Sequence, residues 1–181
     1  KMYLKQQGIS ISGRVVTENL EEKILQAKAD LDSVGGKVEI VAEGVPAGVG
    51  EPFFNSVESV MAHLLFSIPG VKGVEFGAGF ALADMRGSEA NDEFYIENGQ
   101  VKTRTNNAGG INGGISNGMP IVARVAFRPT TSIKKPQNTI DIEAMQPVTY
   151  AVEGRHDPCI ARRGVVVAES AVAIALAELM L

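Results

Sequence analysis

The chain has 181 residues, a formal net charge of -4 and 45% hydrophobic residues, which is the size and composition of one folded domain with its own core. Its acidic balance and its aromatic content of only 6% exclude the basic, aromatic surface of a typical nucleic-acid-binding protein. One cysteine excludes an internal disulfide framework and favours a cytoplasmic protein. The start of the chain lacks the apolar core of a signal peptide, and Glu169 and Glu178 interrupt its apolar last segment, so neither a leader nor a membrane span is expected.

The first third of the chain alternates between strand and helix patterns. Apolar residues alternate over residues 9–15, which predicts a half-buried strand. Asn19 and Glu22 form the pattern of a helix N-cap and its N3 partner. An apolar helical face then runs over residues 20–34, and the glycines at 35–36 predict the end of that helix.

A second strand and a second helix follow. Lys37–Ala42 alternates like a strand, and Gly44–Pro52 is a glycine- and proline-rich loop. Asn55 and Glu58 repeat the capping pattern, and apolar residues recur at helical spacing as far as residue 68. This order of strands and helices predicts a layered α/β domain.

Three further strands are expected downstream. The Asn98-Gly99 pair between the first two is typical of a tight hairpin turn. The predicted strands cover Glu93–Ile96, Val101–Thr105 and Pro120–Phe127.

Residues 154–159 concentrate polar chemistry between two segments that read as buried. Within six residues this stretch holds Arg155, His156, Asp157 and Cys159. A strand-like run over residues 148–152 leads in, and an apolar helical run over residues 165–181 leads out. Polar groups that are desolvated in this way are costly unless they have partners, which favours a functional site. A structural Arg155–Asp157 pair that only closes a corner is the alternative.

Two other segments have the composition of ligand loops. Asn106–Gly118 contains five glycines and four asparagines, so its backbone could approach a ligand closely and point N–H groups at an anion. In Arg128–Ser132 a cation stands beside three hydroxyl side chains, which suits a phosphate group. A flexible loop and a capped turn are the respective alternatives. His63 and Cys159 are expected to be packing or surface residues, and the spacing of Glu89, Asn91 and Asp92 does not predict a metal site.

Taken together, these motifs resemble chorismate synthase. The Arg155-His156-Asp157-Pro158-Cys159 run, with Gly164 and Glu169-Ser170 after it, is similar to the C-terminal signature of that family. Other blocks follow in the family's order from about Gly36 onward. They are Gly44–Phe54, Ser67–Gly77, Arg86–Asp92, Asn106–Ile111 and Gly113–Ser116.

The resemblance assigns roles to individual residues. It implies that Asp157 is catalytic, close to the reactive edge of a flavin, and that Arg155 binds both substrate and cofactor. His156 is not assigned an acid or base role, because it would point away from Arg155 in an extended segment. The remaining cofactor-binding residues implied by the resemblance are Pro69, Gly70, Gly113, Arg128, Pro129, Thr130, Thr131 and Ser132. Arg128 stands where the family has lysine, and no metal ligand is implied.

The resemblance also implies a fold and a reaction. The expected fold is a β-α-β sandwich with helices between mainly antiparallel sheets, of which residues 1–181 form the C-terminal half of one domain. The expected activity is that of a carbon–oxygen lyase that converts 5-enolpyruvylshikimate 3-phosphate to chorismate and phosphate by anti 1,4-elimination, using reduced FMN, in a homotetramer. The alternative is a catalytically silent folding or oligomerisation module that retains part of the flavin pocket.

Overall fold

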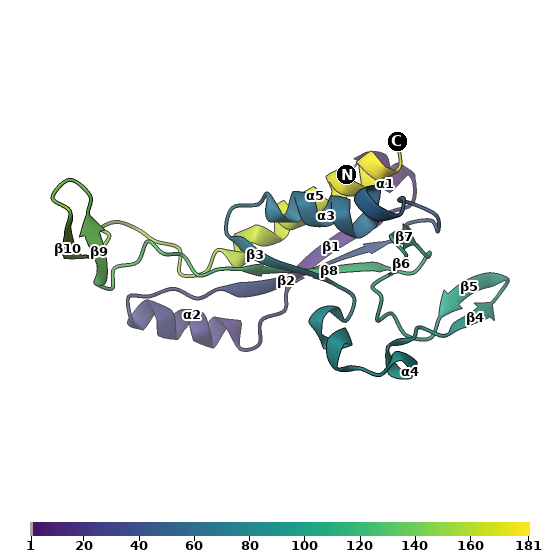
Figure 1. Ribbon diagram of the computed structural model, residues 1–181, viewed down its shortest axis with the longest axis horizontal. Helices are drawn as coiled ribbons and strands as arrows, with labels where there is room; N and C mark the ends of the chain where they lie inside the picture. The colour runs from purple at the N-terminus through teal and green to yellow at the C-terminus, as the bar shows by residue number, and fades with distance from the viewer. Residues whose placement is uncertain (1) are drawn as a thin grey trace.

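The computed structural model describes residues 2–181 and is built on a four-stranded antiparallel sheet (Figure 1). The strands lie in the order β1 (Ser10–Val15), β2 (Gly36–Glu43), β8 (Ile121–Phe127) and β3 (Val71–Phe76). Buried and half-buried residues alternate along β8, because successive side chains of a strand point to opposite faces of the sheet. One face of the sheet is therefore part of the hydrophobic core.

Two helices cover that face. They are α3 (Val57–Phe66) and α5 (Ala161–Leu179), which pack against each other and against the strands (Figure 1). Buried residues of α3 recur at helical spacing, as Val57, Met61 and Leu65 do. The expected packing of helices on a mainly antiparallel sheet is confirmed, and residues 2–181 supply one large sheet.

The remaining elements lie around this body. α2 (Leu20–Ala29) connects β1 to β2 and lies below the sheet in the view of Figure 1. The β4–β5 and β9–β10 hairpins project from opposite ends of the molecule (Figure 1). The other bounds are α1 Met2–Gln6, η1 Phe53–Asn55, η2 Gly79–Asp84, α4 Gly87–Ala90, β4 Phe94–Glu97, β5 Gln100–Thr103, β6 Ile111–Asn112, β7 Ile115–Ser116, β9 Gln137–Asp141 and β10 Gln146–Tyr150.

The helix predicted from the apolar face over residues 20–34 is α2, and it is shorter than that pattern predicts. α2 ends at Ala29, because Leu31 adopts a positive φ of 59° that no helix allows. Asn19 does precede the helix, but its side chain makes no capping hydrogen bond. The cap of α3 is Ser56, one residue after the predicted Asn55, and its hydroxyl accepts the N–H of Ser59. The predicted turn at Asn98-Gly99 is confirmed by positive φ at both residues.

The segment before the polar motif is not buried, contrary to the sequence prediction. All five residues of β10 are exposed, and β10 pairs only with β9. The helix after the motif begins at Ala161 rather than at Val165. The motif therefore lies between an exposed hairpin and a buried helix.

Glu169 of α5 contacts the first strand of the sheet. Its Oε1 accepts the N–H of Gly13 on β1 at 2.8 Å. β1 is an edge strand, and an unpaired edge is a template for strand addition by another chain. The Glu169 carboxylate therefore accepts one of the N–H groups that this edge would otherwise leave unpaired.

The opposite face of the sheet carries a row of alternating charges. Arg14, Glu39, Arg124 and Glu75 occupy the same register on the four strands. Arg124 Nε lies 2.8 Å from Glu75 Oε1, and Arg14 Nη2 lies 2.8 Å from Glu39 Oε1. Burial would raise the pKa of Glu75, but Arg124 and the N–H of Phe80 lower it below its ordinary value. The ladder favours this register, because a slip of β2 or β3 against β8 would separate the opposite charges.

Candidate anion-binding site

The candidate site lies at the end of the sheet where β8 ends and β3 begins. The N–H of Arg128 donates to the carbonyl of Gly70 at 2.8 Å. Gly70 has a φ of 89°, and a Cβ there would lie 2.9 Å from Ile160 Cδ1, just before α5. Three of the predicted site segments, those of Gly70, Arg128 and Arg155–Cys159, therefore meet at one end of the sheet.

Residues 33–36 pack against the Arg128 segment and the polar motif at this end of the sheet. The Ser33 hydroxyl donates to the Thr130 carbonyl at 2.5 Å, and the N–H of Val34 donates to the Pro158 carbonyl at 2.8 Å. A Cβ on Gly35 would lie 2.5 Å from the Phe127 carbonyl oxygen. This support was missed in the sequence, where Gly35-Gly36 indicated only the end of a helix. The two adjacent glycines before a buried strand were the available signal of close backbone packing.

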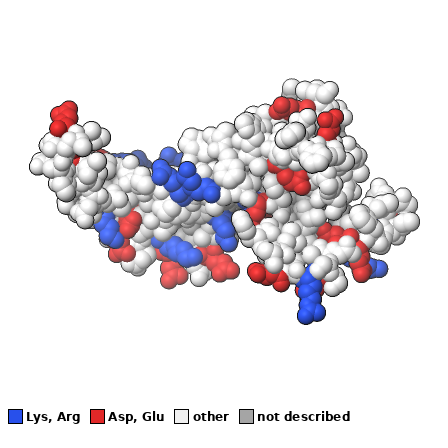
Figure 2. Space-filling view, in the orientation of Figure 1, with Lys and Arg blue, Asp and Glu red and all other residues white. Residues whose placement is uncertain are grey.

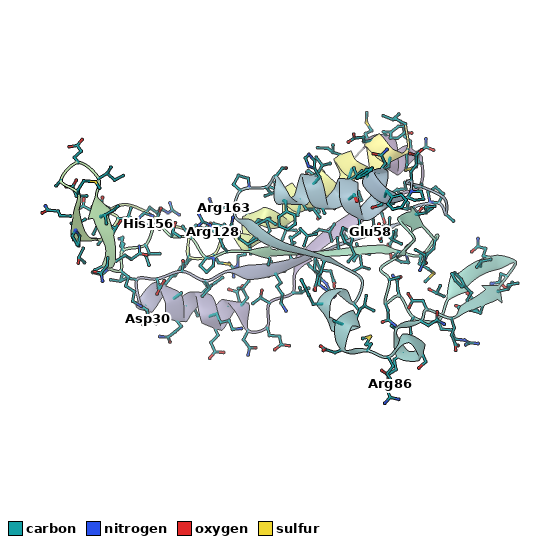
Figure 3. The ribbon with its side chains drawn as sticks, in the orientation of Figure 1. Asp30, Glu58, Arg86, Arg128, His156 and Arg163 are labelled. Carbon is teal, nitrogen blue, oxygen red and sulfur yellow. The ribbon has the colours of Figure 1, made fainter. Side chains whose placement is uncertain are left out.

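Basic side chains line a pocket of about 280 Å³ beside the start of α5. Figure 2 shows Lys and Arg gathered on the surface between the β9–β10 hairpin and the helices, and Figure 3 labels Arg128, His156 and Arg163 in that region. Four lysine or arginine side chains line the pocket, and Asp157 is the one acidic side chain among the lining residues. The lining residues are Ile24, Lys28, Arg155, His156, Asp157, Pro158, Cys159, Arg162 and Arg163.

Asp157 pairs with Arg163 rather than with Arg155. Its Oδ2 lies 3.1 Å from Arg163 Nε, and its Oδ1 accepts the N–H of Cys159 at 3.1 Å. Arg155 is exposed and has no ion pair among residues 2–181. The alternative of an Arg155–Asp157 corner is therefore wrong in its partner, and Arg155 has its charge available for a ligand.

His156 and Cys159 complete the wall. The expectation that His156 points away from Arg155 depended on an extended segment, but this segment is not a strand and both residues line the same pocket. His156 Nε2 lies 3.2 Å from the Val152 carbonyl oxygen, so this ring nitrogen is engaged with the backbone. Cys159 is 2% exposed, as expected of a packing residue.

The Arg128 segment has the donors that a phosphate group needs. The side chain of Arg128 is exposed and has no ion pair among the residues that the structure describes. The Thr130 hydroxyl is buried and has no hydrogen-bond partner in the same part of the chain. Guanidinium and hydroxyl groups both donate to phosphate oxygens. Pro129, Thr131 and Ser132 lie on the exposed or half-exposed part of this turn, with Pro69 beside it.

Gly113 does not lie with the other predicted cofactor residues. It stands at the turn of the β6–β7 hairpin, whose Gly114 carbonyl accepts the N–H of Val57 at the start of α3. Gly70 follows the end of the same helix, which is about 15 Å long at 1.5 Å per residue. Within one copy of residues 2–181, Gly113 and Arg128 are therefore at opposite ends of α3.

The first half of the asparagine–glycine loop holds an anion that belongs to the protein itself. The Asp92 carboxylate accepts the N–H groups of Asn107 and Ala108 at 2.7 and 2.8 Å and the Thr105 hydroxyl at 2.6 Å. Burial would raise the pKa of Asp92, but these three hydrogen bonds lower it below its ordinary value. The prediction that these N–H groups face a ligand anion is therefore wrong for Asn107 and Ala108.

Within residues 2–181, no helix has the length and apolarity needed to span a membrane, and no group of acidic, histidine and cysteine side chains is placed to hold a metal ion.

Comparison with known proteins identifies the relatives of this chain. A model of the chorismate synthase family matches residues 1–181. The chorismate synthase of Methanothermobacter thermautotrophicus is 55% identical over 163 residues, which are 90% of this chain and 44% of that protein. That of Thermococcus gammatolerans is 53% identical over 164 residues, which are 91% of this chain and 46% of that protein. The chain thus spans about half the length of the curated relatives it matches.

A solved structure described as the crystal structure of chorismate synthase has the same fold. It superposes with a TM-score of 0.82 at 27% sequence identity, over 100% of this chain and 60% of the other. The similarity covers the sheet, the helices and the polar motif together. The chain belongs to the chorismate synthase family.

Proposed function

We propose that the protein acts in the conversion of 5-enolpyruvylshikimate 3-phosphate to chorismate and phosphate, with reduced FMN as cofactor. Family membership supports the reaction class, a carbon–oxygen lyase reaction on a phosphate ester. The observation that carries the proposal for this chain is the basic pocket, where Lys28, Arg155, Arg162 and Arg163 surround a single carboxylate, Asp157.

The charge of the pocket suits the substrate. 5-Enolpyruvylshikimate 3-phosphate has a phosphate and two carboxylates, and guanidinium groups bind such groups through paired, charge-assisted hydrogen bonds. Arg155 has no ion pair within residues 2–181, so a ligand anion would not have to displace a protein carboxylate from it. Arg155 would hold an anionic group of the substrate in this pocket.

The Arg128 segment fits the phosphate of FMN. Arg128 and the unpartnered Thr130 hydroxyl would hold that phosphate, with the Pro69-Gly70 backbone beside them. The flavin, when bound, supplies electron density that assists departure of the substrate phosphate. Gly113 fits the same flavin less well, because α3 separates it from Arg128 in one copy of the chain.

Asp157 is the carboxylate in the pocket that can accept a proton. Its carboxylate is held by Arg163 and by the N–H of Cys159, so its direction is fixed before a ligand binds. A fixed carboxylate next to bound substrate can take up a ring proton as a general base. Lys28, Arg162 and Arg163 would keep the pocket positive while that proton moves.

FMN binding tests the cofactor part of the proposal. We expect weak FMN binding by residues 1–181, in the micromolar range or weaker, because the described residues surround only part of a ligand. The fluorescence of FMN would be titrated with the wild-type chain, with the R128A/R155A double variant, and with K102A as the control on the distant β4–β5 hairpin. Submicromolar binding, or binding that R128A/R155A leaves unchanged, would contradict the assignment.

Turnover distinguishes the enzyme from a silent module. The full product of the gene would be assayed anaerobically with reduced FMN and 5-enolpyruvylshikimate 3-phosphate, and chorismate would be measured. Absence of turnover together with intact FMN binding would favour a module that only folds or assembles with other chains. A homotetramer in the cytoplasm also belongs to this proposal, on the strength of the family resemblance, and sedimentation of the full gene product tests the assembly.

A further inference from the structure

Both oxygens of the Asp157 carboxylate are engaged by the start of α5. The N–H of Cys159 donates to Oδ1 at 3.1 Å, and Arg163 Nε forms an ion pair with Oδ2 at 3.1 Å. The side chain of Asp157 is 25% exposed, whereas that of Arg163 is 81% exposed. The carboxylate is therefore contacted at two points, by the backbone N–H of Cys159 and by the largely exposed guanidinium of Arg163.

Without Arg163, Asp157 would have another cation within reach. Arg155 lies two residues away along the chain and lines the same pocket, and it has no ion pair within residues 2–181. Asp157 is the only acidic side chain in the lining. It is therefore the internal competitor for any ligand anion that would bind Arg155.

We propose that Arg163 is a positioning residue that holds Asp157 against the start of α5 and so keeps Arg155 available for an anion. The proposal rests on the proposed function, in which this pocket binds an anionic group. In this proposal the two arginines have different partners. Arg163 contacts the protein carboxylate, and Arg155 contacts the ligand.

The role is directional rather than stabilising. An ion pair with one partner this exposed contributes little to folding stability, because water screens it. The planar guanidinium nevertheless fixes the direction of a carboxylate better than an ammonium group does. Loss of Arg163 should therefore leave the melting temperature nearly unchanged while it changes the contacts of Asp157.

Arg162 provides a matched control. It is the neighbouring residue of α5, has the same charge and lines the same pocket, but it pairs with Glu21 of α2 instead of Asp157. Replacement of either arginine by glutamine removes one positive charge from the pocket. Only replacement of Arg163 removes a contact of Asp157.

The first experiment needs no ligand. In ¹⁵N-labelled protein, R163Q should shift the amide resonance of Cys159 and speed its hydrogen exchange, because the carboxylate that accepts this N–H is released. R163K should restore part of the effect, and R162Q should leave this amide as in the wild type. A Cys159 amide that is unchanged in R163Q would overturn the positioning role.

The second experiment measures binding of inorganic phosphate, followed by the Arg155 side-chain Nε–H resonance. We expect R163Q to weaken phosphate binding about three- to fivefold, the range of an exposed ion pair, and D157N in the same chain to restore it. D157N should change phosphate binding by the same factor in R162Q protein as in the wild type, because Arg162 pairs with Glu21 and not with Asp157. If D157N restored phosphate binding equally in R163Q protein and in R162Q protein, net charge alone would explain the effect, and the proposal would be overturned.

The two experiments fail separately. If the wild type does not bind phosphate, the anion site of the proposed function fails, and with it the role of Arg155. The Cys159 amide still decides whether Arg163 holds Asp157.

Discussion

At the scale of single residues, Asp157 is the group whose replacement separates catalysis from structure. We expect D157N in the full gene product to lower kcat by about 10²–10⁴-fold, the usual contribution of a general base, with a much smaller change in KM. An amide has the shape of the carboxylate but cannot take up the proton. Steady-state kinetics and thermal melting of the same preparation measure both effects.

The structure already limits the alternative for Asp157. Its ion pair is with Arg163, whose side chain is 81% exposed, so D157N should leave the melting temperature nearly unchanged. A clearly lower melting temperature with kcat intact would instead make Asp157 a scaffold residue.

Asp92 makes a different residue-scale prediction, about pH and stability. Its pKa is lowered in the folded protein despite burial, because the Thr105 hydroxyl and the N–H groups of Ala108 and Asn107 bind the ionised form. The folded state therefore binds this proton less readily than the unfolded chain. The stabilisation is fully present above the unfolded pKa, about 3.9, and is lost as the pH falls through the lower folded pKa.

Urea unfolding at several pH values tests the role of Asp92. We expect D92N to lower the free energy of unfolding at pH 7 by about 1–3 kcal/mol, the cost of leaving a buried group badly paired. The variant should also lose less stability than the wild type between pH 5 and pH 2. D84N, at an exposed position of η2, is the control, and equal behaviour of D92N and D84N would contradict the prediction.

At the scale of elements, α5 depends on a glycine where it crosses the end of β8. A Cβ at Gly164 would overlap ring atoms of Phe127, whose side chain is 5% exposed and has little room to move. We expect G164A to destabilise the protein by about 1–3 kcal/mol, the usual cost of overpacking a core. Calorimetry would measure the loss.

A second substitution identifies the cause of that loss. F127L should recover part of the stability in the G164A background, because it removes ring atoms that the new methyl group meets. G87A in α4 has open space around it and should be close to neutral. If G164A behaved like G87A, the packing of α5 on Phe127 would not limit the helix position.

The elements that could be predicted from the sequence are those whose pattern is local. Alternation identified β1 and β2, the strand predicted over Pro120–Phe127 is β8, and the Asn98-Gly99 turn identified its hairpin. The end of α2 could not be predicted, because the residues that follow it are held by distant parts of the chain. Ser33 and Val34 donate hydrogen bonds to Thr130 and Pro158, about a hundred residues away in sequence. The exposure of β10 was also missed, because its apolar residues resemble those of a core strand.

The candidate site was predictable in its residues and less so in its contacts. Arg155 and Asp157 do share a pocket, as their spacing in the motif indicates. The partner of Asp157 is on the next helix, and a polar residue two positions away was the natural but wrong choice. The flavin role of Gly113 stays a prediction, because in one copy of residues 2–181 it lies at the other end of α3 from Arg128.

At the scale of the whole molecule, the described residues hold few groups for acid–base chemistry. His156 is the one histidine in the pocket lining, and its Nε2 is engaged with the Val152 carbonyl. His63 is exposed on α3. We expect a polypeptide of these 181 residues to show no chorismate synthase turnover on its own, because its residues surround only part of a ligand and hold few groups for general acid–base catalysis.

An anaerobic assay of that polypeptide with chemically reduced FMN measures the turnover directly. The full gene product, assayed beside it, is the positive control. Clear production of chorismate by the 181-residue polypeptide, abolished by D157N, would show that the residues in hand suffice for the reaction.

The contact between Glu169 and Gly13 has a consequence for how the chain is made. The two residues are 156 positions apart, and a ribosome adds about 5–20 residues per second. For roughly eight to thirty seconds after β1 emerges, its outer edge therefore lacks the Glu169 carboxylate that later accepts the N–H of Gly13. During that interval nascent chains on neighbouring ribosomes could pair through β1, and only the later synthesis of α5 supplies the carboxylate that covers this edge.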